Sequence, residues 1–572
     1  MAEGPRRRLR LVITLLIGIV LVILAQLVQV QIVDHGFYEK WAEDQRVRPV
    51  AMSDAPRGKI RDRNGYLLAG NAVLYSIEAD TAYVVDVERA SIALGALLHA
   101  PPARIERLLE SDAYWVQIAP SVSKEVGEEI ADLEIFGITV RPIWAREYPE
   151  GALAAHALGF CTAEITGFYG VEGFYDEQLR PEKVEWVGPV DPASEQIPWV
   201  VAPVLLPQPG IDLELTLDRT VQSLAEAELA RSVWEYQAEG GTIIVMDPRT
   251  FEILALTSWP NYEPAQYTEF FDRKPLPFED PAVSQQYEPG SVFKVLTVAA
   301  ALDARLVTPE TTYHDQGWIE VGGQKIENAT RRAYGDQTVT GILIQSLNVG
   351  AAWLNTQMGP GTFYRYVQAF GIGQPTEVDL AGEASGQLWL PDDYEHWHDS
   401  NLGTNSFGQG LAVTPLQMIA AVATVANGGT RLRPHIVARR VEPDGAVFTA
   451  QPVVEAQPIA PQTARALAEM MVRVVDEGVP QARVEGYRVA GKTGTAQIPI
   501  PGGYDPQDTI ATFIGFGPTP DAQIVILVKL DRPKTSPWAS ETAAPAFQRL
   551  ATRLFRVLNI PPESVAVAEA VR

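Results

Sequence analysis

A serine and a lysine lie three residues apart in the stretch "QQYEPGSVFKV", at Ser291 and Lys294. A serine hydroxyl is a weak nucleophile unless a neighbouring base accepts its proton, and a lysine one helical turn away is within reach of that hydroxyl. The pair could therefore be a covalent nucleophile, Ser291, with Lys294 as its base, or two ordinary residues at the start of a buried helix, and the spacing alone does not decide between them. The same spacing recurs at Ser121 and Lys124, where "SVSKEVGEEI" is typical of a short polar helix that we expect Ser121 to cap.

Two further triplets distinguish the Ser291 pair from the Ser121 pair. Ser346 and Asn348 form the Ser-x-Asn of "ILIQSLNVGAAWL", and Lys492-Thr493-Gly494 opens a predicted strand in "VAGKTGTAQI". Both follow Ser291 in the chain. The order Ser-x-x-Lys, Ser-x-Asn, Lys-Thr-Gly is that of the penicillin-recognising serine enzymes. Taken singly, each triplet could be structural, as a helix cap or an exposed strand, but their combination in this order favours a catalytic site.

The elements expected around these triplets come from distant parts of the chain. Apolar residues at helical intervals predict a helix within 215–236, and a hairpin of two strands follows in 241–260 around the turn from Asp247 to Thr250. A helix-rich middle region leads to three strands and a final helix, at 489–498, 509–518, 522–533 and 541–557. This pattern implies an α+β fold with one antiparallel sheet and an inserted helical part beside one edge of the sheet, giving a cleft.

The N-terminus predicts a membrane anchor. Four arginines within the first ten residues precede an uncharged apolar run over 11–33, which is long enough to cross a bilayer about 30 Å thick as a helix. The basic residues are expected to stay in the cytoplasm and the rest of the chain to lie outside the membrane. A cleaved signal peptide is the alternative, but no Ala-x-Ala site closes the run.

Residues 34–215 show mixed helix and strand patterns. Strands are predicted over 75–87 and 137–149, and short helices over 103–110 and 124–133. The charged stretch 34–50 is expected to continue the membrane helix, and the Pro-rich passage 187–209 to form a linker.

Composition excludes several kinds of site. The net charge of −25 argues against a nucleic-acid-binding surface, and the single cysteine, Cys161, rules out an intramolecular disulfide framework and a cysteine-based zinc site. We expect Cys161 to be buried and unreactive. His396, His398 and Asp399 lie close together in a polar loop, where we expect exposed residues rather than a metal site. Asp62 and Arg63 in "IRDRNG" are expected to have a structural role.

Beyond the triplets, the chain resembles the class B penicillin-binding proteins over nearly its whole length. The resemblance rests on "PRGKIRDRNGYLLA", "REYPEGALAAHALGF", "GVEGFYDEQL", "YEPGSVFK", "SLNVGAA", "SFGQGLAVTPLQM" and "GKTGTAQ". The wording "YEPGS", "SLNVGA" and "SFGQG" is closer to the septal, cell-division branch than to the elongation branch. The resemblance implies a cytoplasmic tail (1–10), a transmembrane anchor (11–33), an elongated mixed α/β pedestal of the dimerisation type (34–215), a transpeptidase domain with a helix-flanked antiparallel sheet (216–560) and a tail (561–572).

The resemblance also implies a role for each candidate residue. Ser291, Lys294 and Ser346 would be catalytic, with Ser346 relaying a proton to or from the leaving group. The backbone N–H groups of Ser291 and Thr495 would form the oxyanion hole. Substrate would be held by the Asn348 amide, by the Lys492 cation, by Gly494 on the same strand, and by the hydroxyls of Thr493 and Thr495. Burial and the positive charge of Lys492 are expected to lower the pKa of Lys294, so that the amine can act as a base.

The activity implied is cross-linking of peptidoglycan stem peptides through an acyl-enzyme, by a D,D-transpeptidase that beta-lactams acylate. No metal or organic cofactor is called for. The implied partners are lipid-linked precursor strands, a SEDS-family membrane glycosyltransferase contacted through the anchor and pedestal, and other division proteins, but no nucleic acid. The alternatives are a D,D-carboxypeptidase or beta-lactamase, an elongation-branch transpeptidase, and a non-catalytic scaffold or beta-lactam sensor. A beta-lactamase would need an efficient deacylating water, and no clear Glu-x-x-x-Asn loop lies between the second and third motifs.

Overall fold

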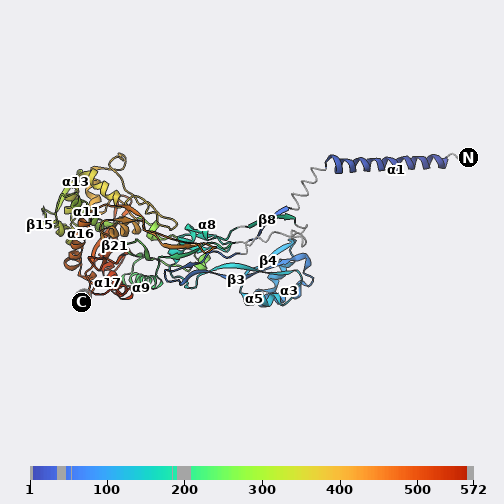
Figure 1. Cartoon of the computed structure of the whole chain (residues 1–572), viewed down its shortest axis with the longest axis horizontal. Coiled ribbons are helices and arrows are strands. Elements are labelled where there is room, and N and C mark those ends of the chain that lie inside the picture. Colours follow the sequence, from blue (N-terminus) through green and yellow to red (C-terminus); the bar gives the residue numbers. More distant parts are fainter. Residues whose placement is uncertain (1–3, 35–46, 53–54, 183, 190–207, 563–572) are drawn as a thin grey trace. The chain divides into compact units, whose positions relative to one another are not determined.

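The computed structural model describes residues 4–34, 47–52, 55–182, 184–189 and 208–562. The chain divides into two compact units, Met1–Ala55 with Pro181–Gln208, and Pro56–Arg180 with Pro209–Arg572. Most of the predicted helix continuation over 34–50, of the Pro-rich linker over 187–209 and of the tail over 561–572 lies outside the described residues. Figure 1 labels the main elements of both units.

The first unit contains the apolar helix that the sequence predicts. Helix α1 (Gly4–Val28) continues as a π-helical turn, Gln29–Val33. Over Ile13–Val33 the mean hydropathy is 2.6, and this stretch is long and apolar enough to cross a membrane. The structure is therefore consistent with the predicted N-terminal membrane anchor. The unit also contains β1 (Val47–Met52), which pairs antiparallel with β8 (Val184–Pro189).

The second unit is built around a five-stranded antiparallel sheet in the order β11-β10-β22-β21-β20. These strands are β10 (Gly240–Met246), β11 (Ile253–Trp259), β20 (Ala490–Ile500), β21 (Gly503–Gly517) and β22 (Ile524–Asp531). The sheet thus combines a hairpin from the start of this region with three strands from its end, as the sequence predicts. Nearly every residue of β10, β11 and β22 is buried, so both faces of the sheet are covered.

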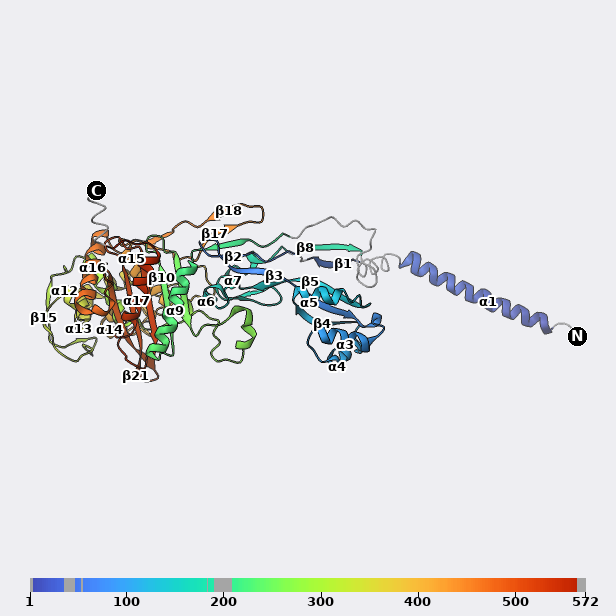
Figure 2. The same cartoon turned by 90° about the horizontal axis from the view of Figure 1, so that it is seen from below.

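Helices cover this sheet. Helices α9 (Arg219–Tyr236) and α17 (Ala543–Val557) contact each other and pack on its strands, while α15 (Pro415–Ala426) contacts β10, β21 and β22 (Figure 2). Helix α9 starts where the Asp218 carboxylate accepts two backbone N–H groups, and α15 starts at a capping box formed by Thr414 and Gln417.

The inserted part lies between β11 and β20. Its helices and 3₁₀ turns include η4 (Gly290–Phe293), α11 (Lys294–Asp303), α12 (Val339–Ile344), α13 (Asn348–Ala369), α14 (Asp399–Thr404), η5 (Asn405–Phe407) and α16 (Pro461–Arg473). It also contains two small hairpins, β12 (Thr312–Asp315) with β15 (Gly335–Thr338) and β13 (Trp318–Val321) with β14 (Gln324–Glu327). Because η4 contacts the edge strand β20, the insertion meets the sheet at the edge where β20 lies.

A second sheet joins the pedestal to the catalytic region, which is the part of the chain after residue 215 that contains Ser291, Ser346 and Lys492. Its order is β18-β17-β9-β2-β3-β4, with β5 also paired to β3. The pedestal strands are β2 (Ile60–Arg61), β3 (Leu67–Asp80), β4 (Trp115–Val122) and β5 (Ile138–Glu147), and the others are β9 (Asp212–Leu215), β17 (Val437–Val441) and β18 (Val447–Thr449). The β17–β18 hairpin comes from far along the chain and lies beside β9 (Figure 2).

Short helices complete the pedestal: α3 (Val87–Leu97), α4 (Pro102–Leu109), α5 (Lys124–Ala131), α6 (Ala155–Leu158), α7 (Gly170–Phe174) and α8 (Asp176–Leu179). One detail of the sequence analysis is wrong here. Ser121 lies in strand β4 and does not cap α5. The cap is Ser123, whose hydroxyl accepts the backbone N–H of Val126.

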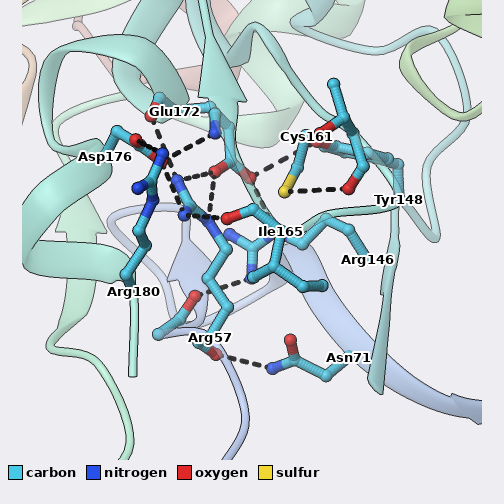
Figure 3. Close-up of polar contacts among 12 residues, drawn as sticks. Arg57, Asn71, Arg146, Tyr148, Cys161, Ile165, Glu172, Asp176 and Arg180 are labelled. Carbon is cyan, nitrogen blue, oxygen red and sulfur yellow. Dashed lines mark hydrogen bonds and ion pairs between the residues drawn. The ribbon is translucent and has the colours of Figure 1, made fainter. Parts of the chain in front are cut away.

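Three stretches that carry the family resemblance meet in a buried cluster of charges (Figure 3). The carboxylate of Glu172 pairs with Arg57 at 2.7 Å and with Arg146 at 2.6 Å, and all three side chains are buried. Arg57 also pairs with Asp176 at 2.9 Å. Arg57 comes from "PRGKIRDRNG", Arg146 from "REYPEGALAAH", and Glu172 and Asp176 from "GVEGFYDEQL". These ion pairs therefore connect three separate segments of the pedestal.

Asp62 connects the pedestal to the catalytic region. Its buried carboxylate accepts the backbone N–H groups of Asn64 and Tyr66 with Oδ1, and that of Arg219 at the start of α9 with Oδ2. These contacts support the structural role expected of Asp62. Arg63 makes one partly exposed ion pair, with Glu252.

Candidate active site

Ser291 lies in the first turn of a helix, as the sequence predicts. The 3₁₀ turn η4 starts at Gly290 and leads directly into α11, whose first residue is Lys294. Gly290 has a φ of 57°, and its N–H donates to the Gly408 carbonyl. A glycine is favoured here because side chains rarely tolerate this φ. Ser291 is half-buried, whereas Lys294 is fully buried.

The Lys294 amine lies between the serine and two carbonyl oxygens. Its Nζ is 2.8 Å from Ser291 Oγ, 2.7 Å from the Ser346 carbonyl oxygen and 2.8 Å from Asn348 Oδ1. The carbonyl oxygens can only accept hydrogen bonds, so they take two N–H groups of the amine. In a neutral amine this leaves the lone pair for the Ser291 hydroxyl. Burial, and then the positive charge of Lys492, hold the pKa of Lys294 well below its usual value.

Ser346 lies in a tight turn before α13, and Asn348 is the first residue of that helix. Ser346 has a φ of 56°, an unusual value for a residue with a side chain. Its Oγ is 3.3 Å from Lys294 Nζ and accepts a hydrogen bond from Lys492 Nζ at 3.0 Å. The Asn348 side chain donates through Nδ2 to the Glu327 carbonyl at 3.1 Å, which leaves Oδ1 directed at Lys294. The turn therefore presents one hydroxyl and one amide to the two lysines.

Strand β20 brings Lys492 to the same place. The Lys492 side chain is buried, and burial lowers the pKa of Lys492 to about 7. A Cβ at Gly494 would lie 2.7 Å from the Pro289 carbonyl oxygen, so glycine allows the strand to pass close to the start of η4. Thr493 and Thr495 are half-buried on this strand, and Thr495 Oγ1 accepts the Ala539 N–H at 3.2 Å.

Five of the predicted residues are thus linked by one hydrogen-bond network: Ser291, Lys294, Ser346, Asn348 and Lys492. Gly494 borders this group through its contact with the residues before Ser291. Within the residues described, the hydroxyls of Thr493 and Thr495 make no hydrogen bond to the five. Their strand brings them near, and the backbone carbonyl of Thr493 accepts a hydrogen bond from Lys492 Nζ at 3.1 Å.

The motifs do not include Asn328, a residue that supports the Ser346 turn. Asn328 is buried directly after β14, and its Oδ1 accepts the Val349 N–H at 3.1 Å, beside Asn348. Its Nδ2 donates to both carboxylate oxygens of buried Asp315, at 3.0 Å. No sequence pattern predicts this role, because the partners of Asn328 come from separate segments. From the sequence alone, an asparagine in a polar stretch is interpreted as a loop residue.

The other candidates lie outside this network. Lys124 is exposed and pairs with Glu128 at 3.7 Å, while Ser121 lies in a strand. Cys161 is buried, and burial raises the pKa of its thiol to about 12. His396 stacks on Trp389 and pairs with Asp393. Among the described residues, no group of three or more His, Cys, Asp or Glu side chains is placed to hold a metal ion.

Family models match most of the chain. The model of the penicillin binding protein transpeptidase domain covers residues 241–552, and the penicillin-binding protein dimerisation domain covers residues 52–215. Curated relatives include stage V sporulation protein D of Bacillus subtilis, which is 32% identical over 97% of this chain and 86% of its own. Another is the peptidoglycan D,D-transpeptidase FtsI of Escherichia coli, 28% identical over 92% of this chain and 88% of its own.

Solved structures give the same result. Penicillin binding protein 3 from Mycobacterium tuberculosis, complexed with aztreonam, is 27% identical with a TM-score of 0.70, over 90% of this chain and 98% of that one. Penicillin binding protein 2X from Streptococcus thermophilus is 24% identical with a TM-score of 0.76, over 89% of this chain and 80% of that one. The second likeness concerns the fold.

Proposed function

The chain belongs to the class B penicillin-binding proteins, which are peptidoglycan D,D-transpeptidases, and we propose that Ser291 is its nucleophile and Lys294 the base. The observation that supports these roles best is the position of Lys294 Nζ, 2.8 Å from Ser291 Oγ with two carbonyl oxygens taking its N–H groups. An amine held in this way has its lone pair available for the serine proton.

In the first half-reaction, Ser291 Oγ attacks the carbonyl carbon of the D-Ala-D-Ala amide, and its proton passes to Lys294 Nζ. The negative charge that develops on the carbonyl oxygen is stabilised by the backbone N–H groups of Ser291 and Thr495. The C–N bond then breaks. The departing D-alanine amine takes up a proton through the Ser346 hydroxyl, which lies between the two lysine amines. An acyl ester on Ser291 remains.

In the second half-reaction, an amine of a neighbouring strand attacks this ester and gives up a proton, and Ser291 regains its hydroxyl as the cross-link forms. Asn348 holds a peptide carbonyl of the substrate with its amide. Lys492 supplies a cation, and Thr493 and Thr495 supply hydroxyl donors, for the terminal carboxylate. Gly494 lets the strand approach the nucleophile. None of these steps requires a metal or organic cofactor. A beta-lactam acylates Ser291 in the same way, but its leaving group stays attached.

Labelling with fluorescent penicillin tests these assignments. The wild-type protein should acquire one stable label per chain, and Ser291→Ala should acquire none. Ser121→Ala is the matched control, because it removes the serine of the other Ser-x-x-Lys pair. A labelled Ser291→Ala protein would refute the assignment of the nucleophile. Rapid release of the label would favour a beta-lactamase or carboxypeptidase, which hydrolyse the acyl-enzyme.

We further propose that the enzyme acts in septal cell-wall synthesis. The likeness to FtsI of Escherichia coli and the wording of "YEPGS" and "SFGQG" support this branch. A fluorescent fusion should collect at the division site, whereas even labelling of the side wall would favour the elongation branch. Because the chain is also similar to a sporulation protein, the same fusion can test whether the enzyme takes part in other cell-wall processes.

The proposed topology follows from the N-terminal helix. Residues 1–10 would lie in the cytoplasm, 11–33 would cross the membrane once, and the pedestal (34–215) and the transpeptidase domain (216–560) would lie outside, followed by a tail (561–572). We propose that the anchor and pedestal contact a SEDS-family glycosyltransferase and other division proteins. Protease accessibility in spheroplasts tests the topology, and co-purification with and without residues 1–33 tests the contact.

A further inference from the structure

Glu288 is a buried carboxylate three residues before Ser291 that joins three segments. Glu288 is only 8% exposed. Its Oε1 accepts the backbone N–H of Gly410 at 2.9 Å and the Tyr504 hydroxyl at 3.2 Å. Its Oε2 is buried without a hydrogen-bond partner in the described part of the chain. The mechanism above uses neither Glu288 nor Tyr504.

Tyr504 belongs to the part of the β20–β21 hairpin that extends beyond the sheet. Strand β21 pairs with β22 only from Ile510 to Gly517, whereas its pairing with β20 continues outward to Gly503. Tyr504 lies in this extension, opposite Pro499. Its hydroxyl reaches back to Glu288, and so ties the outer hairpin to the segment that carries the nucleophile.

The segments joined by Glu288 form the surroundings of Ser291. Gly290 donates its N–H to Gly408, two residues before Gly410, and the Phe407 ring lies 6.0 Å from Lys294 Nζ. On the other side, strand β20 passes close to Pro289 at Gly494. A shift of the hairpin would move Lys492 and Thr495 relative to Ser291. Because Oε1 accepts hydrogen bonds from both neighbours, Glu288 holds the two segments against its own.

We propose that Glu288 and Tyr504 are positioning residues for acylation, which fix strand β20 relative to Ser291. The inference rests on the proposed function, in which Ser291 is acylated and β20 binds the substrate. Neither residue touches the substrate in this proposal. Their effect passes through the distance between the nucleophile and the groups on β20, and small displacements of such groups are costly to the rate of reaction.

The test uses the detergent-solubilised full chain and four variants. Tyr504→Phe removes only the hydroxyl, Glu288→Ala removes both hydrogen bonds, and Glu288→Gln keeps an oxygen that can accept both. Tyr394→Phe is the control, because Tyr394 is 89% exposed. For each protein we would measure the first-order acylation constant with fluorescent penicillin, the dissociation constant of the initial complex, the fraction of active sites and the melting temperature.

We expect Tyr504→Phe to lower the acylation constant per active site roughly tenfold, with little change in melting temperature. Glu288→Ala should lose at least as much, Glu288→Gln should stay within about twofold of wild type, and Tyr394→Phe should match wild type. Full acylation by Tyr504→Phe would overturn the proposal. So would a loss in Glu288→Gln as large as in Glu288→Ala. Failure of the proposed function itself would look different, because Ser291→Ala would then still be labelled.

Discussion

Lys492 Nζ lies 3.0 Å from the hydroxyl of Ser346. The same hydroxyl is 3.3 Å from Lys294 Nζ, so Ser346 stands between two buried amines. Burial lowers the pKa of both lysines, and the charge of Lys492 lowers that of Lys294 further. The arrangement therefore favours one neutral amine beside Ser291 and one charged amine on β20, which suits a base and a carboxylate receptor respectively.

This difference predicts a bell-shaped dependence of acylation on pH. The rate constant at low penicillin concentration should rise as Lys294 loses its proton, because only the neutral amine can accept the serine proton. It should fall above about pH 7, where Lys492 loses the charge that attracts the penicillin carboxylate. Stopped-flow labelling of the wild type and of Lys492→Ala tests this. An unchanged falling limb in Lys492→Ala would assign that limb to another group.

Lys294→Arg should slow acylation strongly, because it replaces a neutral amine with a permanent cation. A guanidinium stays protonated at any pH that the protein tolerates, so it cannot take the serine proton. Loss of a general base typically lowers the rate by about 100-fold to 10,000-fold. Penicillin labelling over hours measures the loss. Lys124→Arg is the matched control, since that lysine belongs to the other Ser-x-x-Lys pair and is exposed. A Lys294→Arg protein that labels at the normal rate would contradict the role of Lys294.

Lys492→Met should stabilise the protein while it impairs substrate binding. The pKa of Lys492 is about 7 in the folded chain and about 10.5 in the unfolded chain, so the unfolded chain binds more protons between these values. The stability of the wild type therefore rises with pH across this window, and the gain from methionine is largest below about pH 7. We expect about 1–3 kcal/mol there after loss of the hydrogen bond to Ser346. Melting temperatures at several pH values measure it. A gain that does not shrink towards pH 10 would contradict this origin.

The motifs predict which side chains lie together around Ser291, because each motif is short and its residues are close to one another in the chain. Ser291 and Lys294 are one helical turn apart, so their contact follows from helix geometry. The partners of Glu288 and Asn328 could not be predicted in this way, because Gly410, Tyr504 and Val349 come from other segments. Such contacts depend on tertiary packing, which a single sequence does not display.

The fold shows the same division between local and distant signals. The hairpin around Asp247 and the strand over 522–533 are predicted correctly because strongly apolar runs mark them. The strands predicted over 489–498 and 509–518 are also present, but β21 already begins at Gly503. Weaker patterns fail at their ends. The strand predicted over 75–87 stops at Asp80, whose carboxylate accepts the Ala82 N–H and starts a 3₁₀ turn. Ser121 is predicted to cap the helix that forms α5, but Ser123 caps it. Either serine is a favoured cap residue, so which one acts as the cap depends on where the helix begins.

Asn328→Ala should lower acylation by roughly tenfold or more through displacement of the Ser346 turn. The variant removes the acceptor of the Val349 N–H and leaves the buried Asp315 carboxylate with fewer donors. The readout is the acylation constant per active site together with the melting temperature. Asn64→Ala is a suitable control, because the Asn64 side chain bonds to Asp218 at an exposed position. Reduced stability with normal acylation of the folded fraction would limit Asn328 to a structural role.

Glu172→Ala should strongly lower the free energy of unfolding. The change leaves Arg57 and Arg146 buried without the carboxylate that both now contact (Figure 3). Breaking a buried pair in this way typically costs about 3–5 kcal/mol, because an uncompensated charge remains in the interior. Glu128→Ala removes the exposed pair with Lys124 instead and should change stability by less than about 1 kcal/mol. Thermal denaturation of the two variants compares these costs directly. Similar melting temperatures would show that the buried cluster tolerates the loss, either through water entry or through rearrangement of the three segments that it connects.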